Sequence, residues 1–194
     1  MVTAADVKKL REQTGAGMLD AKKALDEAQG DFEQATELLR KRGQKIAAKK
    51  ADRDATEGII DCYIHANGKI GVLLELNCET DFVARNDAFK DLAHSIALVV
   101  AASNPVATNP EDVSQDLVDK ELAAAREQAE KEGKPADIIE KVLEGKEKKV
   151  RQELSLMGQS LVTDPDKTVA EAVVEGTAAL GEKITVGRFA RLDK

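Results

Sequence analysis

Two cysteines and two histidines are the residues of this chain that could act as nucleophiles or bases: Cys62, Cys78, His65 and His94. A cysteine nucleophile needs a histidine placed as its base, and the protein would then be a thiol enzyme with a thiolate of lowered pKa. Each cysteine, however, ends or lies within an apolar run typical of a strand, which favours a structural role. His65 is interpreted as a surface residue near a turn, and His94 as packed or half-exposed.

Acidic side chains form the second group that could do chemistry. Acid–base catalysis needs two carboxyl groups held at a fixed separation. Five acids fall in the middle of the chain, but no spacing among them fixes a pair: Asp61, Glu75, Glu79, Asp81 and Asp87. The cysteines fit no metal-binding spacing either. We therefore expect no enzyme active site, no bound metal and no cofactor.

The sequence also lacks a phosphate-binding loop. Its glycine-rich stretch Gly15-Ala16-Gly17 is followed by Met-Leu-Asp, where such a loop carries Lys and then Ser or Thr. Nothing matches a dinucleotide fingerprint. The sequence therefore predicts that the protein holds no nucleotide by itself, because none of its loops would surround the phosphates.

The composition indicates a helix-rich protein with an aliphatic core. Of the 194 residues, 42% are hydrophobic but only 3% are aromatic, so Ala, Leu, Val and Ile must fill the interior. The formal net charge of -7 argues against nucleic-acid binding over the whole surface. No signal peptide or membrane span is apparent, and two thiols in a chain of this length suggest a reducing compartment, so we expect a cytoplasmic protein.

Glycines divide the first 43 residues into three predicted helices, and residues 1–43 are expected to form a small three-helix bundle. Thr3 can cap the first helix, with Asp6 in the capping-box position. The predicted stops are Gly15, Gly30 and Gly43.

Residues 44–56 are basic and weakly amphipathic, and we interpret them as a linker that could itself be helical. From Arg40 to Arg53 the chain carries seven Lys or Arg against one Asp. This run is either a solvated connector or an RNA-binding arm. The connector is favoured, because aromatic residues for stacking on bases are absent.

Strand-like alternation begins at Glu57. The segments 57–65 and 69–78 flank an Asn-Gly turn, which predicts a β-hairpin with a loop of two or three residues. In either register Cys62 lies four or five residues along the partner strand from Cys78, roughly 13 to 17 Å. A disulfide needs Cα atoms within about 7 Å, so these cysteines should not bridge within one hairpin.

The segment 57–194 is expected to fold as an α+β core domain. A helix near 89–100, capped by Asn86, should lie across the hairpin. The return through a helix at 168–180 to a last strand at 183–192 adds a strand beside the hairpin, with two helices on one face of a small antiparallel sheet.

Residues 111–154 read as two charged helices on either side of Gly133-Lys134-Pro135. Their apolar residues follow a narrow seam with heptad spacing. Because so thin a seam covers little surface, we predict an antiparallel coiled-coil hairpin that projects from the core domain.

One aromatic residue, Phe82, stands in the connection between the second predicted strand and the helix that follows it. Connections normally lie on the surface, because their unpaired backbone groups need water. A large ring in that place is either folded back into the core or offered to a partner. The residues alone leave both interpretations open.

Several long stretches resemble the bacterial elongation factor Ts family. They are LREQTGAGMLDAKKAL at 10–25, GDFEQATELLRKRG at 30–43, KIGVLLELNCE at 69–79, TDFVARN at 80–86 and EGKPADIIEKVLEGKEKKV at 132–150. The similarity covers essentially the whole chain. It implies a guanine-nucleotide exchange factor that binds elongation factor Tu in translation and makes no bonds, so that the partner supplies the nucleotide site.

The resemblance also implies which residues contact the partner. In the family, one segment enters the GTPase domain of elongation factor Tu near its magnesium, and it matches Thr80, Asp81, Phe82 and Val83, with Asp81 and Phe82 as the intruding side chains. The first bundle resembles a ubiquitin-associated-like domain. Its turn, which touches the same GTPase domain, matches Gly15, Ala16, Gly17, Met18 and Leu19. From the residues alone Met18 and Leu19 would be core; the resemblance implies partner contact for at least one of them.

The chain resembles the short form of the family, because no room for a duplicated half exists between Val100 and Glu111. Two subunits of a short form can together supply what one long chain does, so a noncovalent homodimer remains open. A disulfide through the last strand is excluded, because Ala190 lies there and neither cysteine does. The alternative function is an RNA- or ribosome-associated adaptor that uses the basic run. We expect elongation factor Tu as partner, no membrane and no direct nucleic acid.

Overall fold

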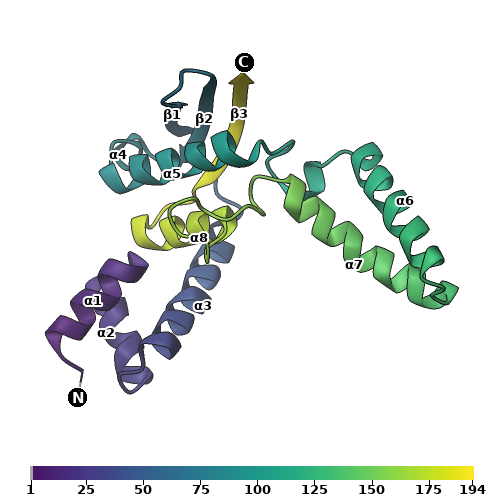
Figure 1. Ribbon diagram of the computed structural model, residues 1–194. Helices are drawn as coiled ribbons and strands as arrows, with labels where there is room; N and C mark the ends of the chain where they lie inside the picture. The colour runs from purple at the N-terminus through teal and green to yellow at the C-terminus, as the bar shows by residue number, and fades with distance from the viewer. Residues whose placement is uncertain (1) are drawn as a thin grey trace. The chain divides into compact units, whose positions relative to one another are not determined.

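The computed structural model describes residues 2–194 (Figure 1). This range contains eight α-helices and three strands, which confirms the predicted α+β class. The helices are α1 (Ala4–Thr14), α2 (Met18–Glu27), α3 (Phe32–Lys50), α4 (Asp81–Ala84), α5 (Asp87–Ser103), α6 (Gln115–Lys131), α7 (Ala136–Leu154) and α8 (Val169–Leu180), with a 3-10 turn η1 at Pro110–Asp112. The strands are β1 (Glu57–Ile64), β2 (Ile70–Cys78) and β3 (Thr185–Asp193).

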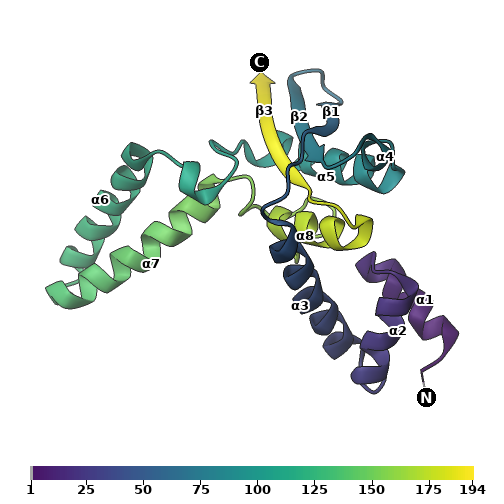
Figure 2. The ribbon, with the colours of Figure 1, turned by 180° about the vertical axis from the view of Figure 1, so that it is seen from behind.

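The three strands form one antiparallel sheet in the order β1-β2-β3 (Figure 2). At the far end of β3, the N–H of Lys194 donates to the carbonyl oxygen of Lys69 at 3.0 Å. The last strand therefore lies beside the second, and the prediction that it joins the hairpin is confirmed.

The hairpin loop is longer than the predicted two or three residues. The N–H of His65 donates to the carbonyl oxygen of Ile70 at 2.9 Å, so residues 66–69 form the connection. Gly68 takes a φ of 67°, in the left-handed region that glycine adopts without a steric cost. This register puts Cys62 opposite Leu73, and both cysteines are free thiols.

The chain divides into two compact units. The first comprises the residues up to Asp61 together with Leu74–His94 and Glu171–Gly187, and the second comprises Cys62–Leu73, Ser95–Ala170 and Arg188–Lys194.

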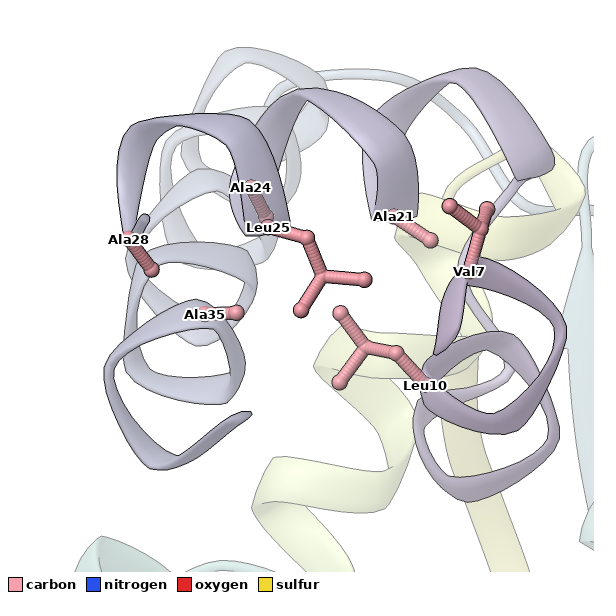
Figure 3. Close-up of a cluster of buried hydrophobic side chains, with 7 residues drawn as sticks. All are labelled: Val7, Leu10, Ala21, Ala24, Leu25, Ala28 and Ala35. Atoms are coloured by element: carbon pink, nitrogen blue, oxygen red, sulfur yellow. The ribbon is translucent and has the colours of Figure 1, made fainter. Parts of the chain in front are cut away.

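In the first unit, α1, α2 and α3 pack around a core of their own. Leu10 of α1 and Leu25 of α2 point toward each other at its centre, and small alanines allow the helices to approach closely (Figure 3). The predicted caps of α1 are present: the Oγ1 of Thr3 accepts from the N–H of Asp6 at 3.2 Å, and Gly15 ends the helix with a φ of 68°. Three packed helices therefore form as expected, and their likeness to a ubiquitin-associated domain stays a prediction.

The predicted end of the third helix at Gly43 is wrong, because α3 continues to Lys50. Gly43 is buried against α8, where a Cβ would lie 3.6 Å from Val174 and 3.7 Å from Ala178. Packing against α8 thus outweighs the low helix propensity of a single glycine, which is worth about 1 kcal/mol. The first part of the basic segment 44–56 is consequently helical and continuous with the bundle.

The helix α5 begins at its predicted cap, because the Oδ1 of Asn86 accepts from the N–H of Ala88 at 2.9 Å. In the first unit, α5 and α8 pack closely at Gly176. A Cβ on Gly176 would lie 2.8 Å from Leu92 and 3.3 Å from Ile184. A side chain at Gly176 would therefore require the end of the Leu92 side chain to shift.

In the second unit, α6 and α7 lie side by side and antiparallel (Figure 1 and Figure 2). Near their open end Val118 and Val150 pack with Val113, and the partly buried Ala107, Leu122 and Leu154 pack against that cluster. Farther out Ala129, Ile139 and Leu143 form a second cluster, whose partly buried neighbours, Leu122 and Ala125, also belong to α6. The outer half of the hairpin is therefore held together by its own residues.

Replacing residues 119–149 with a short Gly-Ser linker should leave a protein that still melts cooperatively, because the outer cluster is formed by residues of the hairpin itself. For a chain of this size, a melting temperature within about 4 °C of the native value corresponds to a loss of roughly 1 kcal/mol. Calorimetry would measure both quantities.

A longer replacement, of residues 113–155, serves as the control for this deletion, since it also removes the Val113, Val118 and Val150 cluster. It should lower the melting temperature further. A molten product from the shorter deletion would show that the outer hairpin belongs to the core.

Candidate functional site

Phe82 lies on α4, a one-turn helix that the sequence did not predict, and its side chain is 80% exposed. Thr80 caps this turn, because its Oγ1 accepts from the N–H of Val83 at 3.5 Å. The next residue, Ala84, is buried and faces the interior. The structure excludes the first of the two interpretations left open by the sequence, because the ring lies outside the core.

Glu182, in the turn between α8 and β3, holds the start of α4. Its Oε2 accepts from the backbone N–H of Glu79 at 3.1 Å and from that of Thr80 at 3.0 Å. Its Oε1 accepts from the hydroxyl of Thr80 at 2.7 Å. Because the hydroxyl proton points at Glu182, the lone pairs of the same oxygen are available to the N–H of Val83. One carboxylate therefore fixes both the backbone and the capping side chain of Thr80.

The carbonyl oxygen of Thr80 is also engaged. It accepts from the N–H of Ala84 at 3.2 Å and from the thiol of Cys78 at 3.2 Å. All the polar groups of Thr80 are thus hydrogen-bonded within the protein, while the ring of Phe82, two residues later, lies in water. The segment has a fixed base and an exposed aromatic tip.

Cys78 is a structural thiol. Its side chain is fully buried, and burial raises the pKa of its thiol, with a further contribution from the nearby carboxylate of Glu182. A raised pKa keeps the sulfur protonated at neutral pH, so that it donates to Thr80 rather than attacking a substrate. The thiol-enzyme interpretation gains no support at this residue.

Glu79, the residue before Thr80, also contacts the turn that carries Glu182. Its carboxylate accepts from the backbone N–H of Lys183 at 2.6 Å and forms an ion pair with Arg53 at 3.1 Å. The N–H of Lys183, followed by the Arg53 guanidinium, lowers the pKa of Glu79 below its ordinary value.

Because the folded pKa of Glu79 is lowered, its contribution to stability is present above the ordinary carboxyl pKa and is lost as the pH falls through the lowered value. Glu79→Gln should therefore reduce the free energy of unfolding at pH 7 and make less difference at pH 3. Urea unfolding at the two pH values would measure this. Glu121→Gln on the exposed side of α6 is the control, and an equal loss for Glu79→Gln at both pH values would contradict the assignment.

The other acids that could have formed a catalytic pair each contact a group that is not a carboxylate. The contacts are Asp61 with His94 at 3.1 Å, Glu75 with Asn77 at 3.1 Å, Asp81 with Arg85 at 2.8 Å and Asp87 with Lys90 at 3.6 Å. Among residues 2–194, no group of three or more His, Cys, Asp or Glu is placed to hold a metal ion.

The turn between α1 and α2, together with the first two residues of α2, carries the second set of expected contact residues, Gly15, Ala16, Gly17, Met18 and Leu19. The side chain of Leu19 is 73% exposed and that of Met18 is 49% exposed. The opposite side of α2 carries the buried residues Ala21, Ala24 and Leu25. The core interpretation of Met18 and Leu19 is therefore wrong, and both side chains are open to a partner.

Most of the basic run is used within the protein. Five of its seven cations, all in the described chain, make internal contacts: Arg40 and Lys41 with Glu37, Arg42 with Glu27, Arg53 with Glu79, and Lys50 with the carbonyl oxygen of Gly181. The ion pairs of Arg40, Lys41 and Arg42 are exposed and weak, so the argument against an RNA-binding arm rests on Lys50 and Arg53, which contact the 181–183 turn and Glu79.

Sequence reasoning missed Glu182 and Lys183 altogether. The only local signal was a glycine turn, Gly181, directly before two charged residues and the last strand. Their contacts with Glu79 and Thr80 join positions more than a hundred residues apart, as the sequence separation of 102 between Glu182 and Thr80 shows. No spacing rule reaches that far.

No helix in the described part of the chain is long and apolar enough to cross a membrane.

Comparison with known proteins places this arrangement of residues in a family. The family model for elongation factor TS matches residues 3–178. A relative named elongation factor Ts from Syntrophobacter fumaroxidans is 51% identical over 190 residues, which cover 98% of this chain and 95% of the relative. The elongation factor Ts of Carboxydothermus hydrogenoformans is 50% identical over 193 residues (100% of this chain and 89% of the relative), and that of Moorella thermoacetica is 51% identical over 193 residues (100% and 95%). The chain belongs to the elongation factor Ts family, a family of guanine-nucleotide exchange factors rather than of enzymes that make or break bonds.

Proposed function

We propose that this protein binds elongation factor Tu and promotes the release of its GDP during translation elongation. Membership of the elongation factor Ts family supports the exchange role. The single observation that carries the proposal at the level of residues is Phe82, an 80% exposed ring on a turn whose base is fixed by hydrogen bonds. A soluble protein gains nothing for its own fold by leaving such a ring in water, whereas a binding surface does.

In the proposed mechanism, Phe82 enters the GTPase domain of elongation factor Tu beside its bound magnesium. Magnesium bridges nucleotide phosphates and protein oxygens, so its displacement removes a large positive charge that holds the diphosphate. Burial of the ring between partner helices supplies roughly 1.5 to 3 kcal/mol toward that displacement. The ring therefore acts as a wedge and makes no bond.

Asp81 would enter beside the ring. In the free protein its carboxylate pairs with Arg85 at 2.8 Å, and its side chain is 48% exposed. An exposed pair of this kind is weak, worth about 0.3 to 0.5 kcal/mol, so exchanging Arg85 for backbone N–H groups of the partner costs little. Thr80 and Val83 would then support these two side chains from the less exposed side of the turn.

The turn from Gly15 to Leu19 supplies a second contact with the same GTPase domain in this proposal. Met18 and Leu19 present apolar side chains, and the glycines let the backbone come close to a partner surface. This contact would add affinity for both states of the partner, whereas Phe82 would distinguish between them. Exchange requires that distinction, because nucleotide and exchange factor must weaken each other's binding by the same free energy.

Release of labelled GDP from purified elongation factor Tu, measured with and without this protein, tests the proposal. Acceleration is the expected result, and it should saturate with protein concentration. Calorimetry of the protein alone with GDP or GTP should show no heat of binding. Unchanged GDP release, or micromolar binding of nucleotide to this chain, would overturn the proposal.

An RNA-associated adaptor is the competing function, and the internal contacts of Lys50 and Arg53 count against it. An RNA-binding protein would lose affinity steeply between low and moderate salt through release of counterions. Gel-shift titrations with ribosomal RNA at two salt concentrations would reveal such binding.

A noncovalent homodimer is a further part of the proposal. In the second unit Ile64, Leu73 and Leu192 are exposed on their strands, and an exposed apolar sheet face favours association. Sedimentation velocity over a range of concentrations tests it, and Leu73→Lys should shift a dimer toward monomer. A species that stays monomeric at all concentrations would exclude the dimer.

A further inference from the structure

The turn at 181–183 contacts the segment that follows α3. The Nζ of Lys183 donates to the carbonyl oxygens of Ala51 at 2.7 Å and Arg53 at 2.8 Å. In return, the Nζ of Lys50 donates to the carbonyl oxygen of Gly181 at 2.5 Å. These lysines supply partners for carbonyl groups that the end of a helix leaves without internal hydrogen bonds. The basic run therefore has a structural task that its sequence did not reveal.

Two carboxylates join the same turn to the base of α4, one carried by the turn and one by the residue before Thr80. Glu182 accepts from the N–H groups of Glu79 and Thr80, and Glu79 accepts from the N–H of Lys183. Arg53 completes the set through its ion pair with Glu79 at 3.1 Å. Hydrogen bonds and one ion pair thus connect five residues, Arg53, Glu79, Thr80, Glu182 and Lys183.

We propose that Glu182 is a positioning residue for nucleotide exchange, which holds the Phe82 turn in its inserting conformation before the partner is met. This inference rests on the proposed role of Phe82. In this inference Glu182 does not contact the partner. It acts only through its three hydrogen bonds, which it accepts from the backbone N–H groups of Glu79 and Thr80 and from the Thr80 hydroxyl.

The physical reason is the cost of ordering. A mobile turn would have to lose its conformational freedom when the ring enters the partner, and this loss would reduce the free energy available for displacing magnesium. Hydrogen bonds to a charged acceptor are stronger than neutral ones, and Glu182 makes three of them. The free protein is therefore ordered in advance, and the ring enters at a smaller cost.

The test compares Glu182→Ala with Glu182→Gln and with Glu121→Ala, which removes the same charge from the exposed side of α6. At saturating concentration, Glu182→Ala should lower the maximal rate of GDP release roughly tenfold, about the effect of ordering one backbone residue. Glu182→Gln keeps an oxygen for the two N–H groups and should stay within about threefold of the native rate. Glu121→Ala should match the native protein.

Combination with Phe82→Ala separates positioning from general stability. If Glu182 acts through Phe82, the double variant should release GDP no more slowly than Phe82→Ala alone. A residue that merely supports the fold would give losses that multiply. Multiplying losses would overturn the inference while leaving the proposed role of Phe82 intact.

A second readout needs no partner. In the free protein, amide hydrogen exchange measured by NMR should be faster at Glu79 and Thr80 in Glu182→Ala, and unchanged at buried positions of α5. Glu182→Gln should stay close to native and keeps the test informative if the alanine variant is poorly folded. If Glu182→Ala left both the amide hydrogen-exchange rates of Glu79 and Thr80 and the rate of GDP release unchanged, the inference would be overturned. By contrast, if the unmutated protein did not accelerate GDP release, the proposed function itself would be overturned.

Discussion

Phe82→Ala should slow GDP release from elongation factor Tu by about 30- to 900-fold while leaving the stability of the protein almost unchanged. Truncation of a buried interface aromatic commonly costs about 2 to 4 kcal/mol, and this range of rates follows if the whole loss falls on the exchange barrier. The side chain is 80% exposed in the free protein, so the free energy of unfolding should change by no more than about 0.5 kcal/mol. Stopped-flow release at saturating variant and thermal melting would measure the two effects.

Phe89→Ala is the matched control for this prediction. Phe89 lies seven residues further along the chain and is fully buried in α5. Its truncation should cost roughly 3 to 5 kcal/mol of stability, as large-to-small changes in a core do. If Phe82→Ala instead melted early and kept its share of exchange activity, Phe82 would be a core residue and the proposed wedge would fail.

Leu19→Ala should weaken binding to elongation factor Tu by about 10- to 150-fold and leave the maximal rate of GDP release nearly intact. Burial of a leucine side chain is worth roughly 1.5 to 3 kcal/mol, which corresponds to that range of affinity. A contact made equally with both states of the partner changes the half-saturating concentration and not the rate at saturation. A titration of exchange rate against variant concentration separates the two.

The same helix provides the control, because Leu25 is fully buried while Leu19 is 73% exposed. Leu25→Ala should lose about 2 to 5 kcal/mol of stability. Leu19→Ala should melt like the native protein. A Leu19 variant with normal half-saturation would exclude the α1–α2 turn as a contact surface.

Much of the fold could be predicted because it depends on local chemistry. The capping box of Thr3 and Asp6 and the Asn86 cap of α5 are short-range patterns, and both are present. The alternation of strands β1 and β2 likewise follows from residues two positions apart. The class of the protein, and the place of β3 in the sheet, followed from the order of these elements.

The hairpin loop and the one-turn helix α4 were missed although their hydrogen bonds are local, whereas the other failures involve contacts that the local sequence does not contain. Gly43 was expected to end α3, but its packing against Val174 and Ala178 of α8 keeps the helix intact. The residues alone could not predict that Phe82 and Leu19 are exposed, because the same apolar side chain suits both a protein core and a binding surface. Glu182 could not be found at all, since its role depends on a turn 102 residues away.

The outer part of the α6–α7 hairpin could differ in length without a change in the way it packs. In the described chain, the hydrophobic cluster of Ala129, Ile139 and Leu143 with Leu122 and Ala125 is made of residues of α6 and α7 themselves, so the packing of this cluster does not fix how far the two helices extend. Seven residues added to each helix would carry the 132–135 connection about 10 Å outward and bring a new apolar layer with them. Insertions should therefore be tolerated in matched pairs, whereas an insertion in one helix alone would put the facing layers out of register.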